Sequence, residues 1–184
     1  CSNTQNVTVV VNPTPLLTSS LTPSAICSGT IFNYTATSST SGVSFSWSRA
    51  LVTGISNAAN SGSTSSISEI LTNNTAAPID VTYVISLSAN GCSNPSTYSV
   101  VVRVNPKPIL NSGLTPTAIC SAGTFSYTAT SATVGTTFSW SRAVVSGISN
   151  LSGSGSSASI SETLTNTSTA PVSVVYLVTL TANG

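Results

Sequence analysis

The sequence predicts an all-β fold made of two tandem copies of one β-sandwich module. Three observations support this: short runs rich in Val, Ile, Thr, Phe and Tyr alternate apolar with polar residues, proline and glycine fall between the runs, and whole segments recur 93 residues apart. Alternation with a period of two is typical of a half-buried strand. A repeat of this length suits an immunoglobulin-like sandwich and is too long for one coil of a solenoid.

The repeat is clearest in segments that carry the less common residues. Ser44–Ala50, which reads Ser-Phe-Ser-Trp-Ser-Arg-Ala, returns as Thr137–Ala143, and Ile67–Glu69 returns as Ile160–Glu162. Each partner lies 93 residues further along (137 − 44 and 160 − 67). The chain is therefore expected to hold two copies of one module, not one larger domain.

A joint that contains two prolines marks the module boundaries. Asn12-Pro13-Thr14-Pro15 is matched by Asn105-Pro106-Lys107-Pro108, and prolines with a fixed φ predict a short, stiff connection. If each module begins at this joint, the chain has three parts. They are residues 1–12 as the last strand of a preceding module, 13–105 as a complete module, and 106–184 as a second module that lacks its final strand.

In the complete module we predict strands over 15–20, 30–38, 43–50, 65–72, 81–89 and 97–104. The strand over 43–50 places a tryptophan on its inward face, as the core of an immunoglobulin-like sandwich requires. The strand over 81–89 alternates most regularly and carries an inward tyrosine. With their copies in the second module, the predicted core aromatics are Trp47, Trp140, Tyr83 and Tyr176. Asn90-Gly91 predicts a tight hairpin turn after the strand over 81–89.

Charged side chains are rare, with four Lys or Arg and three Asp or Glu. Arg49 has the parity of the inward Trp47, and Glu69 has the parity of its apolar neighbours, so both are expected to point inward. Arg142 and Glu162 repeat this arrangement in the second copy. Because an unpaired charge inside a core is costly, we predict the ion pairs Arg49–Glu69 and Arg142–Glu162, each bridging the two sheets.

The residue inventory argues against several functional classes. Histidine is absent, so neither a Ser-His-Asp nor a Cys-His catalytic set is possible. The cysteines are too widely spaced for zinc and the carboxylates too few for calcium. We expect no enzyme activity and no cofactor. A net charge of +1 without a basic cluster argues against nucleic acid, and no apolar run approaches the ~20 residues of a membrane helix.

Four cysteines recur at fixed places. Cys27 and Cys120 precede the second strand of their modules, Cys92 follows the hairpin turn, and Cys1 holds that place for a preceding module. Regularly repeated cysteines in a small β-module indicate disulfides and an extracellular setting. In an immunoglobulin-type topology Cys27 and Cys92 lie at opposite poles, roughly 25–30 Å apart. Bonds between neighbouring modules are therefore favoured, although a bond within one module stays open.

Several motifs together resemble a known repeat. They are Ile26-Cys27-Ser28-Gly29-Thr30, the Ser-Phe-Ser-Trp-Ser-Arg strand, Ile-Ser-Glu-x-Leu-Thr-Asn, and Ala-Asn-Gly-Cys-Ser-Asn before a Val-rich strand that ends in Asn-Pro. Over essentially the whole chain, this pattern resembles the polycystic-kidney-disease-like (PKD-like), immunoglobulin-type repeats of giant Bacteroidota surface adhesins, the flavobacterial gliding-motility adhesins above all. The resemblance implies export by type IX secretion, display on the bacterial cell surface and movement by the gliding machinery.

The leading functional hypothesis is a structural stalk repeat of a long extracellular adhesin filament. Its partners would be adjacent repeats of the same polypeptide, with an external surface or polysaccharide bound through other regions. One alternative is a module that itself binds glycans or surfaces through its Ser and Thr faces. Another is a pilus-like subunit that exchanges strands with neighbouring chains, because residues 1–12 form an extra strand and 106–184 lack one.

Overall fold

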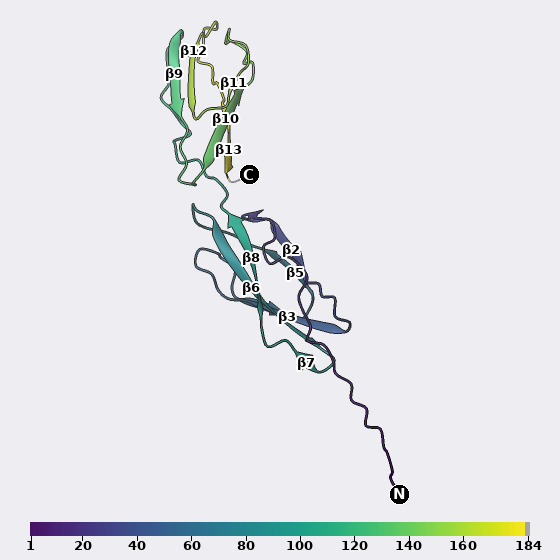
Figure 1. Ribbon diagram of the computed structural model, residues 1–184. Helices are drawn as coiled ribbons and strands as arrows, with labels where there is room; N and C mark the ends of the chain where they lie inside the picture. The colour runs from purple at the N-terminus through teal and green to yellow at the C-terminus, as the bar shows by residue number, and fades with distance from the viewer. Residues whose placement is uncertain (183–184) are drawn as a thin grey trace. The chain divides into compact units, whose positions relative to one another are not determined.

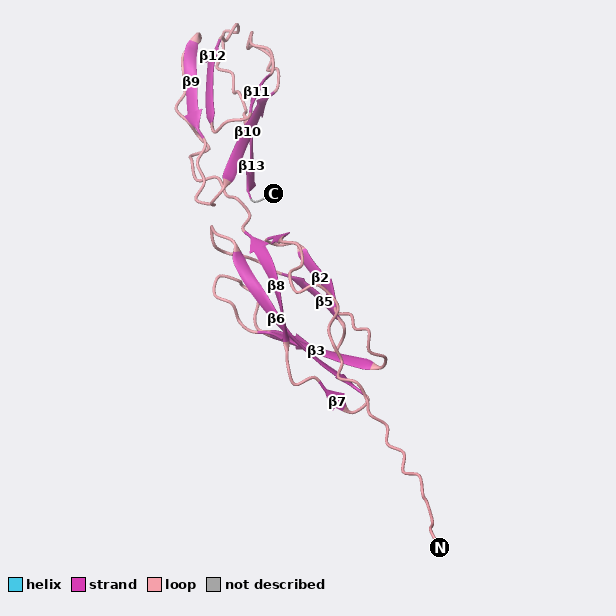
Figure 2. Cartoon of the chain, in the orientation of Figure 1, coloured by secondary structure: helices cyan, strands magenta, loops and turns pink. Residues whose placement is uncertain are grey.

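The computed structural model describes residues 1–182, whose regular elements are all β-strands (Figures 1 and 2). The chain forms two compact units: the first comprises residues 1–74 and 78–104, and the second comprises residues 75–77 and the chain from Asn105 onward. Each unit contains two sheets with a shared apolar interior. The all-β, tandem-sandwich fold predicted from the sequence is confirmed.

The first unit has one large sheet and one small sheet. The large sheet has the strand order β1-β8-β6-β3-β4, with β7 also paired to β6, and the small sheet pairs β2 with β5. Figure 1 shows β2 and β5 as a layer beside the large sheet. The strands are β1 Ile26–Cys27, β2 Ile31–Thr35, β3 Val43–Arg49, β4 Asn60–Gly62, β5 Ser66–Ile70, β6 Ile79–Ala89, β7 Cys92–Ser93 and β8 Tyr98–Asn105.

The core of the first unit lies between these sheets and follows the period-two pattern of the sequence. β6 alternates buried and more exposed residues along nearly its whole length, and β8 contributes three valines that are fully buried. The small sheet contributes Phe32 and Ile67, each 2% exposed. Burying each such side chain contributes about 1.5–3 kcal/mol before chain entropy is counted. The core from β6 and β8 is Val81, Tyr83, Ile85, Leu87, Val100, Val102 and Val104.

The strand expected over 15–20 does not form. This stretch makes a single antiparallel bridge, Leu17 with Ser38, supported by a hydrogen bond from the Thr18 amide to the Thr37 carbonyl (2.8 Å). Pro15 begins this stretch and Pro13 and Pro23 lie on either side of it, and proline has no amide hydrogen to give to a ladder. The strand expected over 30–38 is correspondingly short, because its pairing with β5 covers Ile31–Thr35 only.

The hairpin expected at Asn90-Gly91 is confirmed. Both residues have a left-handed backbone, with φ of 50° at Asn90 and 81° at Gly91. Two successive positive φ values are the geometry of a type I′ turn, whose twist matches that of the strands it joins. The turn connects β6 to the short β7 and pairs Ala89 with Cys92.

The second unit repeats this plan with fewer strands among its described residues. One sheet has the order β11-β10-β13, and the other pairs β12 with β9. The registers match those of the first unit after the 93-residue offset, since Trp47 faces Gly62 and Trp140 faces Gly155. The strands are β9 Gly123–Thr128, β10 Thr136–Arg142, β11 Gly153–Gly155, β12 Ser159–Leu164 and β13 Leu177–Ala182.

The two tryptophans cover glycines on the neighbouring strand. Trp47 is half-buried and stacks edge-on with Tyr83, their ring centroids 5.8 Å apart. A Cβ added to Gly62 would lie 2.8 Å from three atoms of the Trp47 indole, closer than such contacts allow. In the described part of the chain, neither indole N–H has a hydrogen-bond partner although both nitrogens are buried. Glycine at these positions therefore makes room for the tryptophan.

We predict that Gly62→Ala destabilises the first unit by about 1–3 kcal/mol, because a rigid indole must shift to admit the methyl group. Gly113→Ala is the matched control, since nothing lies within 4 Å of its Cβ position and the equivalent residue, Ser20, already carries a side chain (113 − 93 = 20). The control should change stability by less than about 0.5 kcal/mol. Equal effects in urea unfolding would contradict this account.

Candidate functional site

Each predicted ion pair joins the two sheets of its unit. Arg49 lies at the end of β3 and Glu69 on β5, with Arg49 Nε 2.9 Å from Glu69 Oε2 and Nη2 3.0 Å from Oε1. Arg142 on β10 and Glu162 on β12 have the same two contacts at 2.8 and 3.0 Å. This two-pronged geometry is the most specific that arginine makes with a carboxylate.

Other donors complete the coordination of each carboxylate. Tyr83 Oη donates to Glu69 Oε2 (2.5 Å), Asn60 Nδ2 donates to Oε1 (2.8 Å), and Arg49 Nη2 also donates to the Ala58 carbonyl (2.6 Å). The sequence places Tyr83 in the core but does not predict this hydrogen bond. Its signal was present, because Tyr83 has inward parity and recurs as Tyr176 together with the Arg and the Glu.

The electrostatics of the cluster favour an ionised glutamate. Burial of the Glu69 carboxyl opposes ionisation, but hydrogen bonds from Arg49, Tyr83 and Asn60 outweigh it and lower its pKa from 4.5 to about 2. Burial and the hydrogen bond to Glu69 raise the pKa of Tyr83 above its usual range. The hydrogen bond to Glu69 raises the pKa of Arg49. The cluster is therefore a charge-balanced set of hydrogen bonds that links the two sheets.

The second unit contains the same arginine, glutamate and tyrosine in a more open setting, but Gly153 stands in the place of Asn60. Tyr176 Oη donates to Glu162 Oε2 (2.6 Å), and the hydrogen bond from Arg142 lowers the pKa of Glu162. Tyr83 is completely buried, whereas Tyr176 is half-buried, and the side chain of Glu162 is 18% exposed against 9% for Glu69. Two differences accompany this exposure: β8 pairs with β6 and covers the core of the first unit, and Asn60, which donates to Glu69, is replaced by Gly153 in the second unit.

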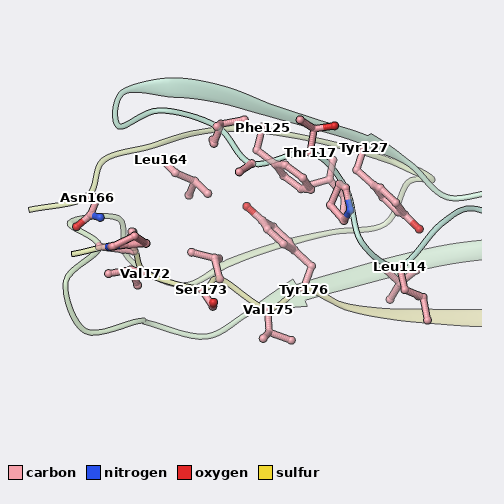
Figure 3. Close-up of a pocket in the computed structure, with 18 of the residues that line it drawn as sticks. Leu114, Thr117, Phe125, Tyr127, Leu164, Asn166, Val172, Ser173, Val175 and Tyr176 are labelled. Carbon is pink, nitrogen blue, oxygen red and sulfur yellow. The ribbon is translucent and has the colours of Figure 1, made fainter. Parts of the chain in front are cut away.

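An open groove of about 700 Å³ runs along the second unit where the first has β8. One wall is the segment from Pro171 to Val178, the other is the segment from Leu110 to Ser121, and the base comes from β9 and β12. Figure 3 shows Tyr176 pointing across the groove toward Phe125; the two ring centroids are 4.9 Å apart. Sequence reasoning placed an open edge here but did not identify the residues that line it.

The lack of a β8 counterpart among the described strands also accounts for the shortness of β13. By the 93-residue offset β6, which begins at Ile79, should have a counterpart that begins at Val172, yet β13 begins at Leu177. In the first unit β3 pairs with β6 only from Tyr83 onward, so Ile79–Thr82 are held by β8 alone. The equivalent residues of the second unit lie outside its described strands because that partner is missing from the ladder.

The four predicted disulfide cysteines, Cys1, Cys27, Cys92 and Cys120, are unbonded in the described chain. Cys27 lies at the pole where Ser28 Oγ donates to the Asn73 carbonyl (3.2 Å) and Asn73 Nδ2 to the Val104 carbonyl (2.9 Å). Cys92 lies at the other end of β6, paired with Ala89. Ten residue steps along β6 separate these ends by roughly 33 Å. A bond between Cys27 and Cys92 of one module is therefore impossible, because a disulfide needs Cα atoms within about 7 Å.

The proline joint is fixed to the module that follows it. Asn12 Nδ2 donates to the Asn90 carbonyl (2.9 Å), and Asn94 Nδ2 donates to the carbonyl of the buried Pro15 (2.9 Å). Residues 1–11 are described as extended chain outside every strand, and Figure 2 draws them as a loop. The hairpin therefore holds the start of its own module in place.

The described residues reveal neither a metal centre nor a membrane-crossing helix. No three His, Cys, Asp or Glu side chains among residues 1–182 lie close enough together to hold a metal ion. In the same residues, no helix is long and apolar enough to cross a membrane.

We predict that the glutamates govern the acid stability of the chain. The lowered pKa of Glu69 means that its contribution is complete above about pH 5 and is lost as pH falls from 4.5 toward 2. The free energy of unfolding in urea should therefore depend far less on pH in this range for the double variant Glu69→Gln, Glu162→Gln than for the unmodified chain. The exposed Asp80→Asn is the control and should keep the dependence. Equal pH slopes in the double variant and the unmodified chain would contradict this assignment.

We predict that Tyr83→Phe destabilises the first unit by about 1.5–3 kcal/mol, because a buried hydrogen bond to a charged group is lost. The matched variant Tyr176→Phe should cost less, since its carboxylate partner is more exposed and water can replace the hydroxyl. Urea unfolding of both variants measures the difference. A larger loss for Tyr176→Phe would be inconsistent with the coverage of the first core by β8.

Comparison with known proteins gives one family. No curated protein is similar enough to the chain to count as a match. The family model of the PKD-like domain matches residues 24–108 and again residues 117–184, so together the two matches cover most of the sequence. Both matched segments contain one ion-pair cluster and one tryptophan–glycine pair. The chain belongs to the PKD-like domain family, whose domains are typically extracellular.

Proposed function

We propose that the chain is a structural stalk segment of a long extracellular adhesin filament, displayed on a bacterial cell surface and used for surface adhesion in gliding motility. The observation that carries the proposal is the clamped joint: the Asn12–Asn90 and Asn94–Pro15 hydrogen bonds fix the connection on the module it leads into. A repeat that holds its own connection suits a load-bearing spacer. The role is mechanical and involves no catalytic step or cofactor.

The charge and aromatic distribution supports a stalk over a glycan-binding module. Carbohydrate and small-molecule sites usually present aromatic side chains to the ligand. The exposed large apolar side chains of the described residues are all Val, Leu or Ile, and the aromatic rings of the first module pack within its core. The outward strand faces carry mainly Ser and Thr, which keep a chain with few charges hydrated.

Electron microscopy of the longer protein that contains these repeats tests the stalk directly. We expect thin, beaded filaments whose length grows in proportion to the number of repeats. Compact particles, or a length that does not depend on repeat number, would contradict the proposal. Strong retention of the isolated chain on a panel of polysaccharides would favour the glycan-binding alternative instead.

The cysteines give a second test. Because Cys27 and Cys92 lie at opposite poles of their module, we propose that each bonds a cysteine of a neighbouring repeat in the longer protein. By the 93-residue offset, the partner of Cys27 would be position 185. Non-reducing peptide mapping should find cross-linked peptides from different repeats. A Cys27–Cys92 peptide, or free thiols throughout the secreted protein, would overturn this part of the proposal.

A further inference from the structure

We propose that the first unit resists tension through a shear contact, in which residues 15–27 must slide along β8 before the sandwich opens. Residues 15–27 are called the entering segment below. The proposal rests on the stalk role, because that role sets the direction of the load. Tension along a stalk enters a module at its proline joint and leaves it after its last strand.

The load enters and leaves the first unit at opposite poles. At the entry, Asn94 Nδ2 donates to the Pro15 carbonyl (2.9 Å) and to Tyr98 Oη (3.0 Å), which places Pro15 near the start of β8. At the exit, the Val104 carbonyl accepts from Asn73 Nδ2 (2.9 Å). Six residue steps from Tyr98 to Val104 separate these poles by roughly 20 Å along β8. Tension therefore pulls the entering segment toward one pole and β8 toward the other.

The entering segment runs beside β8 and in the same direction. Its middle is fixed by the Val101 amide, which donates to the Leu21 carbonyl (2.9 Å). Its last residues, Ile26–Cys27, form β1, which is the neighbour of β8 in the large sheet. β1 lies at the exit pole, where Ser28 Oγ donates to the carbonyl of Asn73 (3.2 Å). The segment thus follows β8 from its start to its end.

Neighbouring chains that run in one direction and are pulled in opposite directions are loaded in shear. Hydrogen bonds between strands lie across the strand axis, so a pull along that axis strains them together instead of breaking them one after another. On its other edge, β8 pairs with β6 from Ile79–Val104 to Ile85–Tyr98. Among the described residues the entering segment has fewer backbone bonds than this ladder, because prolines interrupt it. It is therefore the contact that yields first and sets the resistance.

Side-chain hydrogen bonds fix the entering segment to the small sheet as well. Ser19 Oγ lies 2.6 Å from Tyr34 Oη on β2 and accepts from the Thr37 amide (3.2 Å). The Thr18 amide donates to the Thr37 carbonyl (2.8 Å). The segment is thus held by both sheets, and it cannot slide along β8 without breaking its bonds to the small sheet.

The second unit repeats the bonds to the small sheet. Ser112 Oγ lies 2.7 Å from Tyr127 Oη and accepts from the Thr130 amide (3.2 Å). The Asn111 amide donates to the Thr130 carbonyl at 2.8 Å, the same distance as in the first unit. These bonds therefore belong to the module and not to one copy of it.

Single-molecule force measurements on the whole chain test the direction of loading. In one arrangement the handles pull on the two ends, and in the other they pull on the N-terminus and on Cys92, with Cys1, Cys27 and Cys120 changed to serine in both. Cys92 lies at the entry pole, its Sγ 4.0 Å from the Asn12 carbonyl, so the second arrangement peels the segment away bond by bond. We expect the first unit to open at least about tenfold more slowly at equal load when the ends are pulled, because several bonds must break together. Its opening is recognised by the release of roughly 300 Å of chain.

A pair of serine variants tests which contact bears the load. Ser19→Ala removes the hydroxyl that holds the entering segment, and it should speed opening under end-to-end load by about fivefold. Ser68→Ala is the matched control, since its hydroxyl donates to Asn33 Oδ1 (2.9 Å) across the small sheet and away from the load path. It should leave the rate under load unchanged. Urea unfolding checks that both variants fold.

The proposal is overturned if the two arrangements open the first unit at equal rates, or if the two serine variants speed its opening alike. Electron microscopy of the longer protein decides the stalk role separately. Beaded filaments whose modules show no dependence on pulling direction would remove the shear contact and keep the stalk. Compact particles would remove the stalk, whatever resistance the module shows.

Discussion

The pairing of β8 with β6 determines how much of each sandwich is buried. Along β6, β3 provides a partner only from Tyr83 onward, so the first part of the strand depends on β8 alone. Where β8 is present, β6 spans eleven residues and Val81 and Tyr83 are fully buried. In the second unit the inward residues are equivalent, but the corresponding strand β13 has six residues and Tyr176 is half-buried. One strand therefore decides strand length, core burial and the presence of a groove.

The ion-pair cluster survives this difference, which indicates what it contributes. Both units keep Nε–Oε2 distances of 2.8–2.9 Å, although Glu162 is twice as exposed as Glu69. A buried ion pair is weak evidence for net stability, because the desolvation of two charges offsets their attraction. Its geometric demands are strict, however: the carboxylate accepts from arginine and tyrosine at once, from two strands of the opposite sheet. The cluster fixes the relative position of the two sheets, a role that apolar contacts alone fill less specifically.

The parts of the fold that could be predicted are those that depend on a local sequence pattern. The parity of Arg49 and Glu69 was enough to bring them together, and Asn90-Gly91 was enough to place the hairpin. The short strand β4, Asn60–Gly62, has no alternation, so neither it nor the packing of Trp47 on Gly62 could be found from the sequence. The strand expected over 15–20 was wrong because its two leucines are adjacent instead of alternating, and the prolines in and around it have no amide hydrogen to give to a ladder. The groove depends on contacts between distant segments, and no local pattern encodes its lining.

The same alternating valine pattern occurs twice in the chain, once in a paired strand and once outside any strand. The contrast shows that strand propensity alone does not determine whether such a segment forms a strand. Val100, Val102 and Val104 lie in a strand and are completely buried, whereas Val7, Val9 and Val11 lie outside every described strand and are almost fully exposed. Both segments end in Asn-Pro and have nearly the same propensity. The two segments differ in that only the first has a neighbouring strand to pair with. This matters because β-branched side chains favour a strand mainly by packing against a sheet face.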